Sequence, residues 1–213
     1  EEIKALTRLS CQVNVKQDMI IHVKPDYLNI KEFKEVVTAA QMVTQDTREI
    51  HLKLIEPEKI DFRPGQYIQV SVPGAGEAGV RAYAICSTPG EKNKIELLVR
   101  LVPDGFCSVY LHNVKIDEEI TFMGPYGEFV LDEDIGTELI CVGGGVGMAP
   151  MRSILRHIHD VLPEQKCQFF FGARTTDDTM YMKEVEEMRH EMPNFQVHYA
   201  LSEPKYSPDW QGE

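Results

Sequence analysis

The sequence predicts a small antiparallel β barrel followed by a unit in which strands and helices alternate around a parallel sheet. Between residues 33 and 124, six short apolar runs are separated by turn residues, a pattern typical of barrels. After residue 127, apolar runs alternate with stretches of helical periodicity. A glycine-rich segment joins the first of these later strands to its helix, which is the third observation behind this fold class.

The composition limits the kinds of partner that the chain can have. The 213 residues carry a net charge of −12, which argues against nucleic acid or an anionic membrane surface as the main partner. Five cysteines, an odd number without paired spacing, do not form the pattern of a disulfide framework and favour a reducing compartment. No apolar run approaches the about 20 residues that span a bilayer.

The N-terminal part divides into a short first segment and the barrel. Residues 1–32 do not have the pattern of an independent domain, and two short strands are expected within 8–23. The barrel is expected to occupy residues 33–126, with a domain boundary at the turn residues 124–127. Its strands are expected at 34–43, 49–54, 66–72, 80–86, 94–101 and 119–123, with a single helix at 106–112.

Residues 127–213 are expected to form the parallel unit. Its strands are predicted at 138–142, 166–171 and 195–200, and its helices at 148–162 and 179–191. Three parallel strands make only half of a doubly wound nucleotide-binding domain. We therefore expect this domain to be truncated on its C-terminal side, with a strand edge and an apolar sheet face left exposed.

The glycine-rich segment has the arrangement that binds the pyrophosphate of a dinucleotide. The free N–H groups at a helix N-terminus and the helix dipole both favour an anion there. Positive φ angles and close backbone approach are expected at Gly143 to Gly145 and at Gly147. The alternative is a plain glycine turn between a strand and a helix. The candidate binding residues are Gly143, Gly144, Gly145, Val146, Gly147, Met148 and Pro150.

A second set of residues, in the barrel, fits a flavin dinucleotide. Arg81 and Tyr83 are two apart on a predicted strand, so their side chains point to the same face. An arginine suits a phosphate, and a tyrosine ring offers a stacking surface for a flat heterocycle. Residues 105–108 open the one predicted helix of the barrel and supply a second anion-binding N-terminus.

These motifs together resemble the ferredoxin–NADP reductase superfamily. The succession is Arg-x-Tyr-x-x-x-Ser from Arg81, Gly-x-Cys-Ser from Gly105, Gly-Pro-x-Gly from Gly124, and the glycine-rich segment from Gly143. Together with Phe-Gly-Ala-Arg from Phe171, they are most similar to the family of NADH-oxidising F subunits of sodium-pumping NADH:quinone oxidoreductases. The resemblance covers nearly all of the chain.

The resemblance implies a ferredoxin-reductase-like fold with FAD in the barrel and NADH in the parallel unit. Arg81 would lie on the FAD pyrophosphate, Tyr83 against the isoalloxazine and ribityl groups, with Ala84 and Ile85 next on the strand. Residues 143–147 and Pro150 would hold the nicotinamide dinucleotide. The residues implied at the FAD phosphates are Gly105, Phe106, Cys107 and Ser108.

The N-terminal segment resembles the tail of a plant-type [2Fe–2S] ferredoxin domain. In such domains the fourth cluster cysteine lies in a Cys-Gln-Val run, as Cys11 does here. The other three cysteines come as C-x₄-C-x₂-C, and nothing before Cys11 supplies them. Cys11 is therefore expected to be a metal ligand only in a longer form, and this chain alone is expected to hold no cluster.

The chain departs from the family pattern at three places. Many relatives have a serine whose hydroxyl reaches flavin N5, and this chain has Ala84 there, so that another donor such as a backbone N–H is needed. Only residues 74–80 stand where the pump subunit usually has a long insertion. The late Cys-Gly-Pro motif of the family is absent from this sequence.

The residues after the second parallel strand indicate which nicotinamide cofactor is used. Arg174 is the one basic residue there, followed by Asp177 and Asp178. An aspartate repels the 2′-phosphate of NADPH but can accept a hydrogen bond from the free 2′-hydroxyl of NADH. We therefore expect NADH, with Arg174 and Asp177 in the site. The alternative for the aspartates is simple capping of the helix at 179–191.

The function implied by the resemblance is that of an electron-transfer flavoprotein. A hydride would pass from NADH to FAD at the position of Tyr83 and Ala84, and single electrons would pass on to a [2Fe–2S] centre. The expected partners are a ferredoxin domain or acceptor subunits of a membrane complex. The chain is expected in the cytoplasm at the inner face of the cell membrane, held there by partner subunits or by an N-terminal helix that this sequence lacks. Two alternatives are the reductase component of a multicomponent oxygenase and a dinucleotide-sensing module without turnover.

Overall fold

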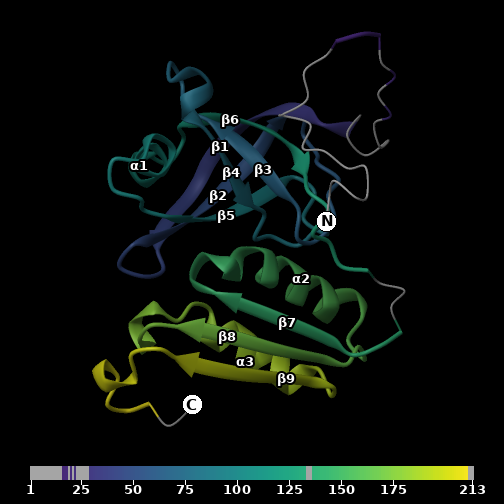
Figure 1. Cartoon of the computed structure of the whole chain (residues 1–213), viewed down its shortest axis with the longest axis vertical. Coiled ribbons are helices and arrows are strands. Elements are labelled where there is room, and N and C mark those ends of the chain that lie inside the picture. Colours follow the sequence, from purple (N-terminus) through teal and green to yellow (C-terminus); the bar gives the residue numbers. More distant parts are fainter. Residues whose placement is uncertain (1–15, 19, 21, 23–28, 133–135, 211–213) are drawn as a thin grey trace.

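The computed structural model describes residues 16–18, 20, 22, 29–132 and 136–210. These residues form an antiparallel barrel and a three-stranded parallel sheet with helices, as the sequence predicts (Figure 1). The strands expected within 8–23 lie largely outside the described residues, as does Cys11. In the part of the chain that is described, no helix is both long enough and apolar enough to cross a bilayer.

Six antiparallel strands form the barrel in the order β4-β3-β6-β1-β2-β5. A bridge between Ile85 and Leu97 joins the two outer strands, so the sheet is nearly closed. The strands are β1 (Lys31–Met42), β2 (Thr47–Glu56), β3 (Tyr67–Ser71), β4 (Val80–Ala84), β5 (Lys94–Arg100) and β6 (Glu119–Tyr126).

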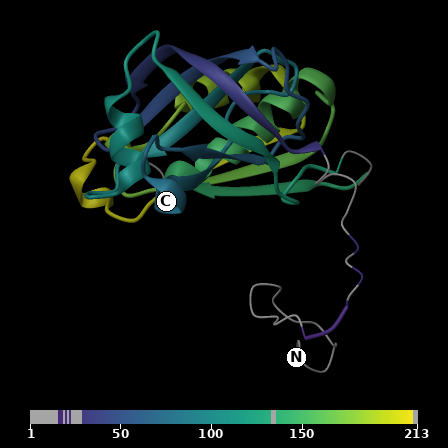
Figure 2. The ribbon, with the colours of Figure 1, turned by 90° about the horizontal axis from the view of Figure 1, so that it is seen from above.

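Alternate residues of the barrel strands point inward and make one apolar core. Helix α1 (Phe106–Asn113) adds Cys107 and Leu111 to this core and stands at one edge of the barrel (Figure 2). Arg48 of β2 donates to the Leu111 and Val114 carbonyl oxygens over 3.0 and 3.1 Å. These bonds satisfy acceptors that a helix C-terminus leaves free, and they fix the position of α1 on the barrel.

Strand β6 continues through residues that the sequence suggested would turn. Tyr126 pairs with Tyr67 of β3, and the two rings stack with centroids 5.5 Å apart. A Cβ at Gly124 would lie 2.9 Å from Ile68 Cγ2, so this glycine permits close packing inside a strand. The chain turns instead at Gly127, whose φ of 104° is favourable only for glycine.

The parallel unit has its helices on one face of the sheet. The strands β7 (Leu139–Gly144), β8 (Cys167–Ala173) and β9 (Phe195–Leu201) lie in this order, and α2 (Met148–Val161) and α3 (Met182–Glu191) share a core with their inward side chains. On the opposite face Ile140 and Val142 are each 68% exposed. The order and type of these elements confirm the sequence prediction. Helix α2 lies between the barrel and the sheet (Figure 1).

Glu35 is an acidic residue in the interior of the barrel. It lies between Phe33 and Val37 among the inward positions of β1 and is fully buried. Among the described residues, neither of its carboxylate oxygens has a hydrogen-bond partner. Burial raises the pKa of Glu35 to about 9, because the charged form loses its hydration and gains nothing in return.

We predict that Glu35→Gln becomes more stable relative to the wild type as the pH rises from 5 to 8. The native pKa of about 9 lies above the unfolded value, so the stability that the neutral carboxyl contributes is complete below the unfolded pKa and is lost as the pH approaches 9. The free energy of unfolding of Glu35→Gln, relative to that of the wild type, should rise by on the order of 4 kcal/mol between pH 5 and pH 8. Urea unfolding at several pH values measures it.

Glu32→Gln is the matched control for this experiment. Glu32 lies on the same strand but is exposed, so its replacement should leave the pH dependence of unfolding as in the wild type. Parallel pH profiles for the wild type and Glu35→Gln would contradict the assignment of a neutral carboxyl at Glu35.

Candidate functional site

A cavity of about 620 Å³ opens between β4, β5, the start of α1 and the start of α2. We call it the barrel cavity. Many of the residues that the sequence singled out, in three separate segments, meet in its wall. Its lining residues include Arg81, Tyr83, Ala84, Gly105, Phe106, Cys107, Ser108, Val146, Gly147 and Pro150.

Strand β4 presents Arg81 and Tyr83 to the barrel cavity. The Arg81 guanidinium donates from Nη1 to the Val80 carbonyl oxygen over 2.7 Å. Because the side chain is exposed, the guanidinium remains available to an anion. Tyr83 is half-buried, and its hydroxyl lies beside the Cys107 thiol at the first turn of α1. Burial first, and then the nearby thiol, raise the pKa of Tyr83, so the phenol remains neutral and offers a flat aromatic face.

The hydrogen bonds of the backbone that follows β4 indicate the direction of the Ala84 N–H. The Ile85 N–H donates to the Gln66 carbonyl oxygen of the neighbouring chain segment over 2.9 Å, and the Cys86 N–H donates to Glu96 on β5 over 2.8 Å. Successive N–H groups of a strand point in opposite directions. The Ala84 N–H therefore points toward the β5 side, and Ala84 lines the barrel cavity.

The first turn of α1 is open to an anion. Gly105 occupies the position before the helix, and no side chain caps the N–H groups that follow it. Ser108 lines the cavity, but its hydroxyl accepts from the Val102 N–H and donates to the Val102 carbonyl oxygen, both over 3.1 Å. In this structure the Ser108 side chain therefore holds the preceding turn in place, while residues 105–108 line the cavity.

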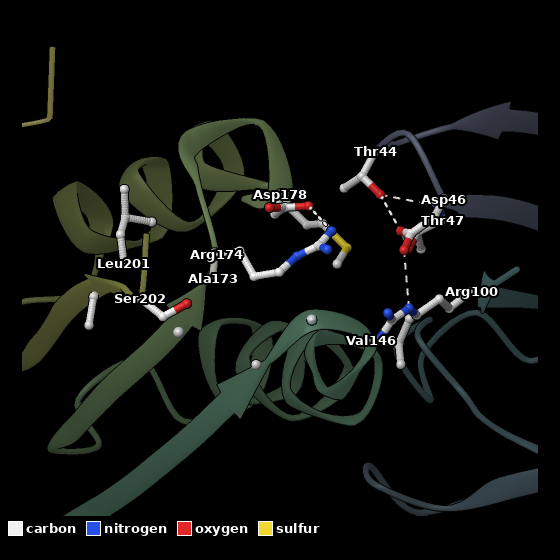
Figure 3. A pocket seen from close by; sticks show the side chains of 15 residues that line it. Thr44, Asp46, Thr47, Arg100, Val146, Ala173, Arg174, Asp178, Leu201 and Ser202 are labelled. Carbon is white, nitrogen blue, oxygen red and sulfur yellow. Dashed lines mark hydrogen bonds and ion pairs between the residues drawn. The ribbon is translucent and has the colours of Figure 1, made fainter. Parts of the chain in front are cut away.

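A second cavity, of about 570 Å³, lies at the carboxyl ends of β7, β8 and β9. We call it the sheet-end cavity (Figure 3). In open parallel sheets this edge is where ligands bind. The glycine-rich segment contributes Gly144, Gly145 and Val146 to its wall, and β8 contributes Gly172, Ala173 and Arg174.

Only one glycine of the glycine-rich segment has a positive φ. Gly145 has φ 53°, whereas Gly144 and Gly147 have φ −158° and −61°, so the expected positive angles at Gly143, Gly144 and Gly147 were wrong. Gly143 is needed for a different reason, because a Cβ there would lie 3.0 Å from Met151 Cγ of α2. A Cβ on Gly145 or Gly147 would meet no atom within 4 Å, which leaves room for a ligand at these two positions.

Arg174 and Asp178 form an ion pair in the wall of the sheet-end cavity. Arg174 Nη2 lies 2.7 Å from Asp178 Oδ1 (Figure 3). The other carboxylate oxygen of Asp178 accepts from the Thr175 N–H and hydroxyl. Burial alone would raise the pKa of Asp178, but these hydrogen bonds and the arginine charge hold it below its ordinary value. Asp178 is therefore a carboxylate at neutral pH.

The capping expected of the aspartates was assigned to the wrong element. Asp178 completes a capping box with Thr175 around the short 3₁₀ turn Thr176–Asp178, and α3 begins only at Met182. Tyr181 precedes α3 with φ 56°, a left-handed conformation that helices do not continue through. Asp177, which the sequence analysis placed in the site, is exposed and does not line either cavity. Its neighbour Asp178 lines the sheet-end cavity.

The two cavities share the residues Val146 and Arg100. Arg100 is at the end of β5, and its Nε lies 3.1 Å from Asp46 Oδ2 in the loop between β1 and β2. Figure 3 shows this pair on the barrel side, facing Arg174 and Asp178. Sequence reasoning missed Arg100 and Asp46 because no local motif marks them; they reach the site only through the packing of the barrel on the sheet.

Not every residue predicted from the sequence lines a cavity. Ile85 is fully buried in the barrel core, and Met148 is fully buried between α2 and the sheet. Gly143 lies behind the wall of the sheet-end cavity, in contact range of Met151. These three residues support the neighbours that are exposed to ligand. Cys11 lies outside the described residues.

Known proteins match the two halves of the chain in the same order. The profile of the oxidoreductase FAD-binding domain matches residues 34–131, and the profile of the oxidoreductase NAD-binding domain matches residues 141–213. The F subunit of the Na⁺-translocating NADH-quinone reductase of Marinomonas sp. (strain MWYL1) is 33% identical over 248 aligned residues, which cover 97% of this chain and 60% of that protein. This chain belongs to the ferredoxin reductase family of flavoprotein oxidoreductases.

Further relatives agree with this family. The F subunit of the same enzyme in Methylococcus capsulatus (strain ATCC 33009 / NCIMB 11132 / Bath) is 34% identical, covering 96% of this chain and 60% of that protein. A cytochrome P450 reductase from Amycolatopsis superposes with a TM-score of 0.75 at 29% identity, over 82% of this chain and 53% of that one. The chain thus spans about 60% of the length of the curated relatives that it matches.

The barrel cavity gives a first test of the FAD assignment. We predict that Arg81→Ala weakens FAD binding by on the order of 1.5–3 kcal/mol, because a charge-assisted hydrogen bond to the pyrophosphate is lost. Fluorescence titration of the apoprotein with FAD measures the dissociation constant. Lys53→Ala, which removes an exposed cation elsewhere on the barrel, is the control and should bind FAD as the wild type does. Wild-type affinity in Arg81→Ala would contradict the placement of the pyrophosphate.

Proposed function

We propose that this chain is the FAD- and NADH-binding part of an NADH-dependent electron-transfer enzyme. The observation that carries the proposal is the shared wall of the two cavities, at Val146 and Arg100. A flavin in the barrel cavity and a dinucleotide in the sheet-end cavity would meet there. Hydride transfer requires the reacting atoms to lie within about 3–3.5 Å of each other, which adjoining cavities permit.

The residues of the barrel cavity fit FAD. Arg81 and the uncapped N–H groups after Gly105 provide positive charge and donors for its two phosphates, and Tyr83 offers a face for the ring system. The Ala84 N–H is the proposed donor to the reactive edge of the flavin, in place of the family's serine hydroxyl. Bound FAD would supply hydride acceptance and single-electron release, and the protein would supply orientation and exclusion of water.

The residues of the sheet-end cavity fit NADH. Gly145 and Gly147 leave space for a pyrophosphate at the N-terminal end of α2, where the helix dipole favours an anion. At the other end of the cavity, Arg174 is already paired with Asp178, so its charge is neutralised where the 2′-phosphate of NADPH would need it. The Asp178 carboxylate can instead accept a hydrogen bond from the 2′-hydroxyl of NADH.

For the acceptor, we propose a [2Fe–2S] centre carried by a ferredoxin domain or by a neighbouring subunit. The support is the name of the relatives, subunits of a Na⁺-translocating NADH-quinone reductase. On this proposal the chain works in the cytoplasm at the inner face of a membrane, held there by partner subunits. We propose residues 33–126 as the FAD unit and 127–213 as the NADH unit, with residues 1–32 as the end of a ferredoxin domain.

A second candidate is a reductase component that feeds an oxygenase. It is favoured by the similarity to the Amycolatopsis cytochrome P450 reductase, at 29% identity. Both candidates share the same oxidation of NADH and differ only in the protein that takes the electrons.

Anaerobic stopped-flow absorbance tests the proposed function. The protein loaded with FAD should lose its absorbance near 450 nm on mixing with NADH, because a reduced flavin no longer absorbs there. A flavin that remains oxidised under saturating NADH would contradict the proposal and favour a dinucleotide-sensing module.

We predict that Asp178→Asn narrows the preference for NADH over NADPH by on the order of tenfold, equivalent to about 1.4 kcal/mol. The substitution removes a negative charge near the 2′ position and releases Arg174 to pair with a phosphate. Rates of flavin reduction at matched concentrations of the two cofactors measure the preference. Asp177→Asn is the matched control and should leave it unchanged, since Asp177 lies outside the cavity wall. An equal effect of both substitutions would show that the aspartates act only through general charge.

A further inference from the structure

A buried arginine of α2 joins the parallel unit to the barrel. Arg152 is 7% exposed, and its Nη1 donates to Glu49 Oε1 of β2 and to Glu96 Oε2 of β5, each over 2.9 Å. The same nitrogen lies 3.5 Å from Cys86 Sγ, at the end of β4. One side chain of the parallel unit thus contacts three separate segments of the barrel.

The opposite side of Arg152 is held by the parallel unit itself. Its Nε and Nη2 donate to Glu184 of α3, both over 2.9 Å. The guanidinium lies over the Tyr181 ring, 3.8 Å from its centroid, and the Tyr181 hydroxyl donates to Glu49 over 2.9 Å. Tyr181 makes both contacts from the left-handed backbone conformation that precedes α3. The orientation of Arg152 is therefore fixed from two directions.

Each carboxylate that Arg152 contacts is paired with at least one cation. Arg156 contributes a second guanidinium, bonded to Glu96 over 2.9 Å and paired with Glu184. Lys94 lies 2.7 Å from the other oxygen of Glu96. Three cations therefore face three carboxylates, and Glu49 and Glu96 are almost fully buried. Removing Arg152 would leave buried carboxylates without their partner, which is far more unfavourable than losing a surface ion pair.

The cluster is close to the wall that the two cavities share. Arg152 lies five residues after Gly147, about 7.5 Å along the axis of the same helix. The start of that helix lines the barrel cavity through Gly147, Ala149 and Pro150, and the turn before it lines both cavities through Val146. A shift of Arg152 relative to Glu49 and Glu96 would therefore move the start of α2 relative to the barrel.

We propose that Arg152 is a positioning residue, which holds the N-terminal end of α2 against the barrel so that a nicotinamide and a flavin bound in the two cavities are aligned. This inference rests on the proposed function. Arg152 does not line either cavity, so it acts through α2 and not by touching a cofactor. Its role differs from that of the residues proposed to bind FAD, because Arg81, Tyr83 and residues 105–108 belong to the barrel, which has its own apolar core.

The test compares Arg152→Lys, Arg152→Met and the wild type. Lysine keeps the charge but cannot bridge Glu49, Glu96 and Glu184 together; methionine removes the charge. We expect unchanged dissociation constants for FAD and NADH, and a rate of flavin reduction at saturating NADH lower by on the order of 10²-fold in Arg152→Lys. The long-wavelength charge-transfer absorbance of stacked nicotinamide and flavin should weaken in parallel. Hydrogen exchange at the amides of α2 should accelerate in both variants, with or without cofactors.

Arg189→Met is the matched control. Arg189 is exposed and pairs with Glu186 of the same helix over 2.6 Å, so rate, absorbance and exchange should all match the wild type. Urea unfolding defines the folded fraction of each variant. If Arg152→Met does not fold, Arg152→Lys alone decides the question.

Two results would overturn the inference. The first is a wild-type reduction rate and charge-transfer absorbance in folded Arg152→Lys, which would make Arg152 merely a stabilising residue. The second is unchanged hydrogen exchange of α2. If the wild type itself is not reduced by NADH, the proposed function fails, whereas the exchange measurement still tests whether Arg152 fixes α2 on the barrel.

Discussion

The arrangement of this protein depends on the buried ion pairs between α2 and the barrel. Arg152 contacts Glu49 and Glu96, which come from strands that are distant in sequence but adjacent in the barrel. Charges this deeply buried are tolerated only when each finds its partner, so the cluster admits few relative positions of barrel and helix. Burial alone would raise the pKa values of Glu49 and Glu96, but hydrogen bonds and the facing cations hold both below their ordinary values. The contacts therefore exist as ion pairs at neutral pH, and the shared wall of the two cavities follows from them.

The sequence was sufficient to predict the fold, because its signals are local. Short apolar runs separated by turn residues mark the barrel strands, and the spacing of Ile154, Leu155 and Ile158 marks the buried side of α2. It failed where a residue's role depends on packing. Gly124 is a residue type common in turns, yet it lies within β6. A glycine is needed there because Ile68 of the neighbouring strand leaves no room for a side chain. Helix α3 begins later than the sequence predicted, because the Tyr181 ring is held against Arg152 and its hydroxyl against Glu49.

The same distinction applies to the site. Arg81, Tyr83 and the start of α1 form recognisable motifs, and the structure brings them into one cavity. Arg100 and Asp46 have no motif, since their meeting depends on how the β1–β2 loop folds over the end of β5. Asp177 and Asp178 are adjacent and chemically identical, and only the fold reveals that Asp178 turns toward Arg174. A periodic pattern reveals an element, but the direction of one side chain at the end of an element depends on its neighbours.

The measurement that tests this account most directly is a crystal structure of the protein with both FAD and NAD⁺ bound. The account predicts the flavin ring beside Tyr83 and Ala84, the adenosine ribose beside Asp178, and the nicotinamide between Val146 and Pro150, within about 3–3.5 Å of the flavin. The contacts of Arg152 with Glu49 and Glu96 should be intact in that complex. A nicotinamide dinucleotide bound away from the carboxyl ends of β7 and β8, or a complex in which α2 has left the barrel, would contradict it.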